Sequence, residues 1–153
     1  MRWLADTNIL LRSAQTSHPM SGDVVRVVRF LLARGDELFV IAQNLIEFWA
    51  VATRPIANNG LGLTIAQATL ELTKLKHLFV VLPDTADILP EWEQLVVEHQ
   101  VFGRQVYDTR LVAAMIVHDL AYLLTFNTTD FKRFTAVTAV KPETIINDEL
   151  RNK

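Results

Sequence analysis

The stretch Arg2–Asn8, RWLADTN, predicts the first strand of the fold and the polar residues that end it. Residues Arg2–Ala5 form a short, largely apolar run, which is typical of a buried strand. The run stops at Asp6, Thr7 and Asn8, a polar cluster of the kind that marks the end of a strand. The carboxylate of Asp6 is therefore expected at the carboxyl end of a buried strand.

Short apolar runs and longer helical segments alternate along the rest of the chain. The pattern predicts further strands at Glu37–Ile41, Phe79–Leu82, Tyr122–Thr125 and Val137–Val140, and helices at Val24–Ala33, Asn44–Thr53, Thr64–Leu78, Asp87–Gln100 and Asp108–Leu120. Thr64 is a suitable helix cap, and Gly35 a suitable helix stop. This alternation indicates parallel strand–helix–strand units, in a sheet covered by helices on both faces.

The composition is that of one globular domain over residues 1–153. Hydrophobic residues make up 50% of the chain and charged residues 21%. The absence of cysteine excludes disulfides and thiolate metal sites. The acid at position 6 leaves no room for the apolar centre of a signal peptide, and no apolar run is long enough to span a bilayer. We expect a soluble, cytoplasmic protein.

The charge and the histidines limit the kinds of site that the chain can carry. The formal net charge is −2, whereas proteins that bind RNA over a broad surface are usually basic. Any contact with nucleic acid must then be local or helped by a metal ion. The histidines, His18, His77, His99 and His118, are scattered and lack the spacing of a zinc site.

Acidic and amide side chains follow several of the predicted strands. Asp6 comes after the first strand, Glu47 lies early in the helix after the second, Asp108 begins the helix before the fourth, and Asn127 and Asp130 follow the fourth. In an open α/β sheet, functional groups gather at the carboxyl ends of the strands. If the strands are parallel, these side chains converge. Because clustered carboxylates repel one another, a hard divalent cation such as Mg²⁺ would stabilise them.

Each of these acids also has a purely structural explanation. Asp6 can cap a helix or a turn, Asp108 can favour a helix amino terminus, and Asp130 can cap a short turn before Phe131. Glu47 is harder to explain in this way, because it lies in an otherwise apolar helix, although a narrow polar stripe would accommodate it. The hypothesis of a site therefore depends on their joint position.

Four motifs together resemble the PIN domain family. They are Asp6–Leu11 (DTNILL), Asn44–Phe48 (NLIEF), Tyr107–Ala114 (YDTRLVAA) and Leu124–Phe131 (LTFNTTDF), and they occur in this order across nearly the whole chain. The resemblance implies an α/β fold of three layers, α/β/α, with a mostly parallel five-stranded sheet. It also implies an endoribonuclease dependent on Mg²⁺ or Mn²⁺. Bacterial proteins of this kind are often VapC-type toxins, which are usually dimeric and are restrained by a small antitoxin.

Carried over to this chain, the resemblance assigns roles residue by residue. The acidic constellation would be Asp6, Glu47, Asp108 and Asp130, with Asp6 and Asp108 holding the metal, Thr7 and Asn8 supporting Asp6, and Thr125 supporting the last motif. Either Asn127 or Asp130 could fill the fourth position; we favour Asp130, with Asn127 as a polar supporting ligand. Glu47 or Asp130 would orient the attacking water. Replacing Asp6 by Asn should abolish cleavage and could raise thermal stability by relieving repulsion.

Other readings of the sequence stay open. Cations that could hold flanking phosphates are Arg54, Arg104, Arg110 and Lys132, although each also fits a solvated surface charge. A metal-dependent phosphatase is one alternative, but the haloacid-dehalogenase type needs an acid where Asn8 stands. A non-catalytic module that binds RNA or protein is another. The apolar segments LIEFWAVA and LVAAMIV lead us to expect spare hydrophobic surface and a symmetric homodimer.

Overall fold

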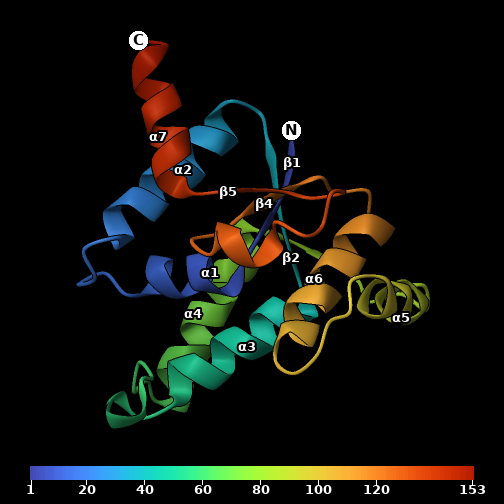
Figure 1. Cartoon of the computed structure of the whole chain (residues 1–153). Coiled ribbons are helices and arrows are strands. Elements are labelled where there is room, and N and C mark those ends of the chain that lie inside the picture. The colour runs from blue at the N-terminus through green and yellow to red at the C-terminus, as the bar shows by residue number, and fades with distance from the viewer.

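The structure is a computed structural model that describes residues 1–153 (Figure 1). Its elements are β1 (Arg2–Ala5), α1 (Thr7–Ala14), α2 (Ser21–Ala33), β2 (Glu37–Ile41), α3 (Ala42–Thr53), the 3₁₀ helix η1 (Ile56–Asn58), α4 (Ile65–Leu78), β3 (Val80–Leu82), α5 (Ile88–Glu98), α6 (Gln105–Val117), β4 (Tyr122–Leu124), the 3₁₀ helix η2 (Thr128–Phe131), β5 (Thr138–Val140) and α7 (Pro142–Arg151). None of the helices has both the length and the apolar composition that a bilayer span requires.

All five strands are parallel and lie in the order β3-β2-β1-β4-β5. The sheet is thus wholly parallel, where the resemblance implied a mostly parallel one. The chain builds outward from β1 to β3, then crosses back to β4 on the other side of β1. This reversal places the carboxyl ends of β1 and β4 next to each other. In open α/β sheets, such a point is where ligands bind.

The side chains of β1 alternate between two cores. Trp3 and Ala5 pack into a core with residues of α1, α2, α3, α4 and α7, whereas Leu4 packs into a second core with residues of α5, α6 and η2. Figure 1 shows α5 and α6 together on one side of the sheet, and α2 and α7 together on the other. The expected α/β/α layering is confirmed.

Two helices of the structure were not predicted from the sequence. The first, α1, begins directly after Asp6 and runs from Thr7 to Ala14. The second, α7, has Pro142 in its first turn, and it packs beside α2 with Pro142 and Ile145 as its buried residues. Short helices of this kind depend on packing for most of their stability, so the local sequence signals them only weakly.

The helices around the predicted site begin earlier than the sequence indicated. Helix α3 begins at Ala42 rather than Asn44, and α6 begins at Gln105 rather than Asp108, so Asp108 lies in the first turn of α6. The apolar segment 111–117, LVAAMIV, is also placed differently from expectation. Residues 111–115 are buried in the second core, so this segment does not provide the spare surface expected for a dimer.

Candidate active site

Asp6 lies at the end of β1, where its carboxylate is held by three neighbours. Oδ1 accepts the Thr7 backbone N–H at 2.7 Å, and Oδ2 accepts the Thr125 hydroxyl at 2.8 Å and the Asn8 amide at 3.3 Å. The side chain caps α1, as the structural explanation of Asp6 required, and it is only 9% exposed. Burial raises the pKa of Asp6 more than the hydrogen bonds from Thr125 and Thr7 lower it.

Asn8 and Thr125 join the ends of β1 and β4. The Asn8 amide also donates to Thr125 Oγ1 at 3.3 Å, and its carbonyl oxygen accepts the Phe126 N–H at 3.4 Å. Thr125 Oγ1 accepts the backbone N–H of Asn127 at 3.0 Å while it donates to Asp6. The first and last motifs are therefore one hydrogen-bonded unit, in which Asn127 takes part through its backbone.

Glu47 is fixed from two sides. The Thr7 hydroxyl donates to Oε2 at 2.8 Å, and the Gln43 amide, one turn earlier on α3, donates to Oε1 at 3.0 Å. The fully buried Asn44 supports this arrangement. Its carbonyl oxygen accepts the Ile41 N–H at 2.9 Å, and its amide donates to the Thr7 hydroxyl oxygen at 3.5 Å. Glu47 is thus oriented by side chains that the fold itself holds in place.

Asp108 and Asp130 complete the group without any hydrogen bond to their carboxylates. Asp108 is half-buried on α6, and its pKa rises to about 6, first because of burial and then because of the charges of Asp6, Asp130 and Glu47. Asp130 is exposed on η2, close enough to raise the pKa of Asp6 as well as that of Asp108. The four acids therefore act on one another electrostatically.

No lysine or arginine forms an ion pair with any of these four carboxylates. No three of them surround one point closely enough to hold a metal ion as the side chains stand. The donor set nevertheless fits a hard divalent cation, because it consists of oxygen atoms alone and its charge is uncompensated. Asp108 and Asp130 make no hydrogen bond that would have to break for their carboxylates to bind such an ion.

A cavity of about 440 Å³, which we call the acidic cavity, opens beside these groups. Its lining residues are Thr7, Glu47, Ala50, Val51, Arg54, Arg104, Gln105, Tyr107, Asp108 and Asp130. Arg54 and Arg104 are both exposed, and neither forms an ion pair within the chain. The cavity thus combines an acidic wall with two free cations, which is an arrangement suited to a metal-bound phosphodiester.

The glycine-rich loop after α3 holds the backbone of Arg54. The Gly62 N–H donates to the Arg54 carbonyl oxygen at 2.8 Å, and the Gly60 N–H donates to the Pro55 carbonyl at 3.0 Å. A Cβ atom at Gly60 would lie 2.0 Å from the Arg54 carbonyl oxygen, so no other residue fits there without moving the backbone. The loop therefore fixes the carboxyl end of α3 and the backbone position of Arg54.

The comparison with known families decides the identity of this fold. The PIN domain model matches residues 4–137, which include all of the acids described above. The chain belongs to the PIN domain family. A search of curated protein sequences finds no significant match.

Solved structures share the fold of this PIN domain at low sequence identity. A chain of VapBC2 from Rickettsia felis, bound to a promoter DNA fragment, is similar with a TM-score of 0.69 and 16% identity, over 92% of this chain and 98% of that chain. FitAcB from Neisseria gonorrhoeae is similar with a TM-score of 0.63 and 20% identity, over 92% of this chain and 98% of that chain. VapC20 from Mycobacterium tuberculosis, a sarcin–ricin loop cleaving toxin, is similar with a TM-score of 0.57 and 16% identity, over 79% of this chain and 86% of that chain.

The PIN domain brings together some of the sequence-predicted site residues and separates others. Asp6 and the residues of the acidic cavity converge, but Asn127 lines a neighbouring pocket of about 340 Å³ with Asn8 and Lys141. Lys132 lines a separate pocket beside β5. Arg110 is paired with Asp84 at 3.2 Å and lines a third pocket.

Sequence reasoning missed Gln43. Its amide nitrogen donates to Glu47 and, at 2.9 Å, to the Tyr107 carbonyl, while its carbonyl oxygen accepts from Arg110 at 3.0 Å. This residue therefore links α3 to α6 within the PIN domain. One signal was available, since Gln43 and Glu47 are four residues apart and so lie on the same face of a helix.

Proposed function

We propose that this PIN domain is a metal-dependent endoribonuclease that cleaves phosphodiester bonds in RNA. The observation that carries the proposal is the group of four acids beside one cavity, which raise the pKa of Asp6 and Asp108 and have no cationic partner. Repulsion among these carboxylates does not stabilise the fold, whereas a bound cation would be attracted by their combined negative charge. The match to the PIN domain family supports the same reaction class.

The residues that would hold the ion are Asp6 and Asp108, with Mg²⁺ or Mn²⁺ as the cation. When bound, such an ion supplies a water of lowered pKa and neutralises charge on the scissile phosphate. Asp6 is preorganised for this role, because its orientation is set by Thr125 and Asn8. Asp108 on α6, whose carboxylate makes no hydrogen bond, would supply a second oxygen ligand.

Glu47 is the better placed of the two candidates for orienting the attacking water. Its carboxylate is fixed by Thr7 and Gln43, and each of its oxygens keeps capacity to accept a further hydrogen bond from a water molecule. Asp130, at the exposed rim, completes the negative wall. Arg54 and Arg104 line the same cavity without ion-pair partners and would hold the phosphates on either side of the scissile bond.

We further propose that the chain is the toxin of a toxin–antitoxin pair and associates as a homodimer. The structural neighbours include the toxin VapC20 and a toxin–antitoxin complex from Klebsiella pneumoniae, although at identities that show the fold alone. An exposed apolar edge supports association: β3 is an edge strand, with Val80 55% and Val81 39% exposed. Light scattering should show a dimer, and expression without an antitoxin should slow growth for the wild-type chain but not for Asp6→Asn.

RNA cleavage by the purified protein tests the reaction. Labelled single-stranded and structured RNAs should be cut with Mn²⁺ or Mg²⁺ and stay intact with EDTA. Asp6→Asn and Asp108→Asn should abolish cleavage, whereas the matched control Asp87→Asn should not, because Asp87 is exposed at the amino end of α5, does not line the acidic cavity and makes no side-chain bond. If the metal-loaded wild type leaves every RNA intact, the nuclease proposal fails. Turnover of small phosphate esters would then favour a phosphatase, and RNA affinity alone would favour a binding module.

A further inference from the structure

A second cavity adjoins the acidic cavity on the side of α5. It measures about 360 Å³ and is mainly apolar, with Ile88, Leu89, Trp92 and Val106 among its lining residues. Tyr107 lines both this cavity and the acidic cavity, so the two are contiguous at that residue. We call it the Trp92 pocket. Its size is within the range of ordinary small-ligand sites.

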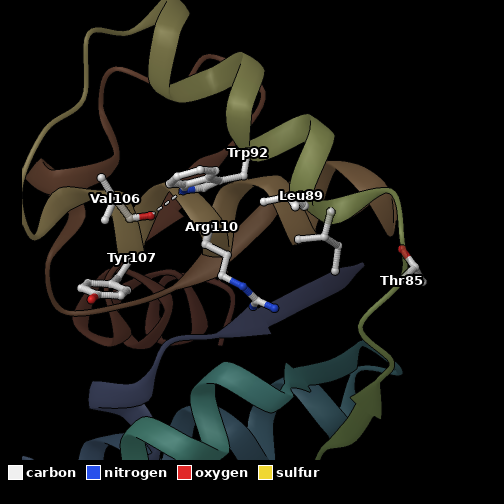
Figure 2. A pocket seen from close by; sticks show the side chains of 7 residues that line it. Thr85, Leu89, Trp92, Val106, Tyr107 and Arg110 are labelled. Carbon is white, nitrogen blue, oxygen red and sulfur yellow. Dashed lines mark hydrogen bonds between the residues drawn. The ribbon is translucent and has the colours of Figure 1, made fainter.

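The walls of the Trp92 pocket are preformed. The indole Nε1 of Trp92 donates to the Val106 carbonyl at 2.8 Å, which ties α5 to α6 (Figure 2). Ile88 is buried in the core behind it, while Leu89 stays 60% exposed and Tyr107 61% exposed at the rim. Figure 2 shows Trp92 and Leu89 on the α5 side, and Tyr107 and Thr85 toward opposite ends. An apolar surface that is rigid yet solvent-exposed favours an occupant that covers it.

Arg110 gives this apolar pocket a polar wall. Its guanidinium is paired with Asp84 at 3.2 Å and donates to Gln43 Oε1 at 3.0 Å, and the side chain remains 33% exposed. Arg110 is the one charged residue among the seven that line the pocket, and Asp84 is not one of them. Because Gln43 also donates to Glu47, a chain of hydrogen bonds runs from the pocket to the acidic cavity.

We infer that the Trp92 pocket binds one unpaired nucleobase of the RNA, next to the scissile phosphate. The inference rests on the proposed function, and it names the part of the substrate that lies beside the cut. A base has flat apolar faces and an edge of donors and acceptors, which match aromatic and aliphatic walls with the Arg110 guanidinium at one side. An apolar peptide side chain would match the walls but would offer Arg110 no acceptor, whereas the edge of a base offers one.

Binding to short single-stranded RNA, measured in EDTA so that no cleavage occurs, tests the inference. Fluorescently labelled oligonucleotides that lack one base at each position in turn serve as probes. For the wild type, removal of one particular base should weaken binding at least about fivefold, and removal of the others should matter less. In Leu89→Ala this difference should disappear, because Leu89 lines the pocket and is too exposed to matter for folding.

Two further variants make the test specific. Leu70→Ala removes a similarly exposed leucine from α4, which lines neither cavity, and should bind like the wild type. Arg110→Lys keeps the positive charge but loses the planar fork, so it should lose the preference for the base while it keeps most of the salt-dependent affinity. A thiouridine at the preferred position should cross-link to the peptide that carries Trp92 or Tyr107.

The outcomes separate the inference from the proposed function. If the metal-loaded protein cleaves RNA but binds every single-base-deleted oligonucleotide equally well, the nuclease proposal stands and the base pocket is wrong. If Leu89→Ala loses affinity for a protein partner while RNA binding is unchanged, the pocket belongs to that partner and the inference is also overturned. If the wild type neither binds nor cleaves RNA, both proposals fail together.

Discussion

The hydroxyl of Thr125 donates a hydrogen bond of 2.8 Å to Oδ2 of Asp6 across a sequence separation of 119 residues. Thr125 follows β4 and Asp6 follows β1, and these neighbouring strands end side by side. The threonine side chain is fully buried, so the bond lies where water cannot replace it. The orientation of the first acid in the site therefore depends on a residue near the other end of the chain.

Thr125→Val should weaken catalysis while leaving the fold nearly unchanged. Valine fills about the same volume but can neither donate to Asp6 nor accept the Asn127 N–H, and a hydrogen bond to a charged group contributes about 1.5–3 kcal/mol. We expect RNA cleavage to slow about tenfold or more, measured as single-turnover rates with saturating metal. Thr125→Ser, which keeps the hydroxyl, is the control and should retain most of the activity. Equal rates for Val and Ser would show that this bond does not position Asp6 for the reaction.

The metal-free protein should lose stability as the pH rises from about 4 to about 7. The pKa of Asp108 is raised from 3.8 to about 6, so its contribution to stability is fully present below 3.8 and is lost as the pH rises through about 6. The raised pKa of Asp6 acts in the same direction. Thermal unfolding in EDTA measures the effect.

Asp108→Asn should make that decline with pH smaller and raise the unfolding temperature at the alkaline end. Asp87→Asn should leave the decline unchanged. Asp36 does not interfere, because its pKa is lowered and its contribution is lost only as the pH falls through about 2. Asp6→Asn is the poorer choice for a stabilising change, since its carboxylate accepts hydrogen bonds that an amide would not all satisfy. An unfolding temperature that rises between about pH 4 and about pH 7 would contradict the assignment.

Mn²⁺ or Mg²⁺ should stabilise the wild-type protein at alkaline pH. A cation that binds only the folded state adds a free energy of RT ln(1 + [L]/Kd), so the unfolding temperature should climb with metal concentration. Asp6→Asn and Asp108→Asn should show little or no such rise, because each removes a charged oxygen ligand. The readout is thermal unfolding and needs no catalytic activity. A metal-dependent rise of the same size in both variants would place the ion elsewhere.

Asp36 should be important for stability and not for cleavage. Its carboxylate accepts a hydrogen bond from the buried Trp3 indole at 2.9 Å, and it is paired with Arg34 and the amino-terminal ammonium. Burial alone would raise the pKa of Asp36, but these bonds lower it to about 2. Asp36→Ala should reduce the free energy of unfolding by about 1–3 kcal/mol, because the Trp3 N–H is left buried without an acceptor.

Urea unfolding measures the loss at Asp36, and Asp36→Asn provides the comparison. The asparagine oxygen can still accept from Trp3, so Asp36→Asn should lose less stability than Asp36→Ala. Both variants should cleave RNA at the wild-type rate at temperatures where they are folded. A slower rate in the folded Asp36→Asn protein would show that this cluster also influences the site.

The sequence by itself determined the strands and the place of the acids along the chain. A buried parallel strand must consist of apolar residues, so Arg2–Ala5 and Glu37–Ile41 were predicted with the bounds that the structure has. The position of Asp6 after β1, and of Glu47 on the helix after β2, followed from the same local pattern. Helices α1 and α7 were missed, because their stability comes from packing rather than from a strong signal of their own.

Only the tertiary structure decided which side chains act on one another. Gln43 could be seen to share a helix face with Glu47, but not to accept a hydrogen bond from Arg110. Lys132 was a candidate for binding phosphate, yet it lines a pocket that includes none of the four acids. The raised pKa of Asp108 depends on its burial and on charges from three other segments. Burial and the separation of charges are set by how distant segments pack, and a linear pattern of residues does not contain those distances.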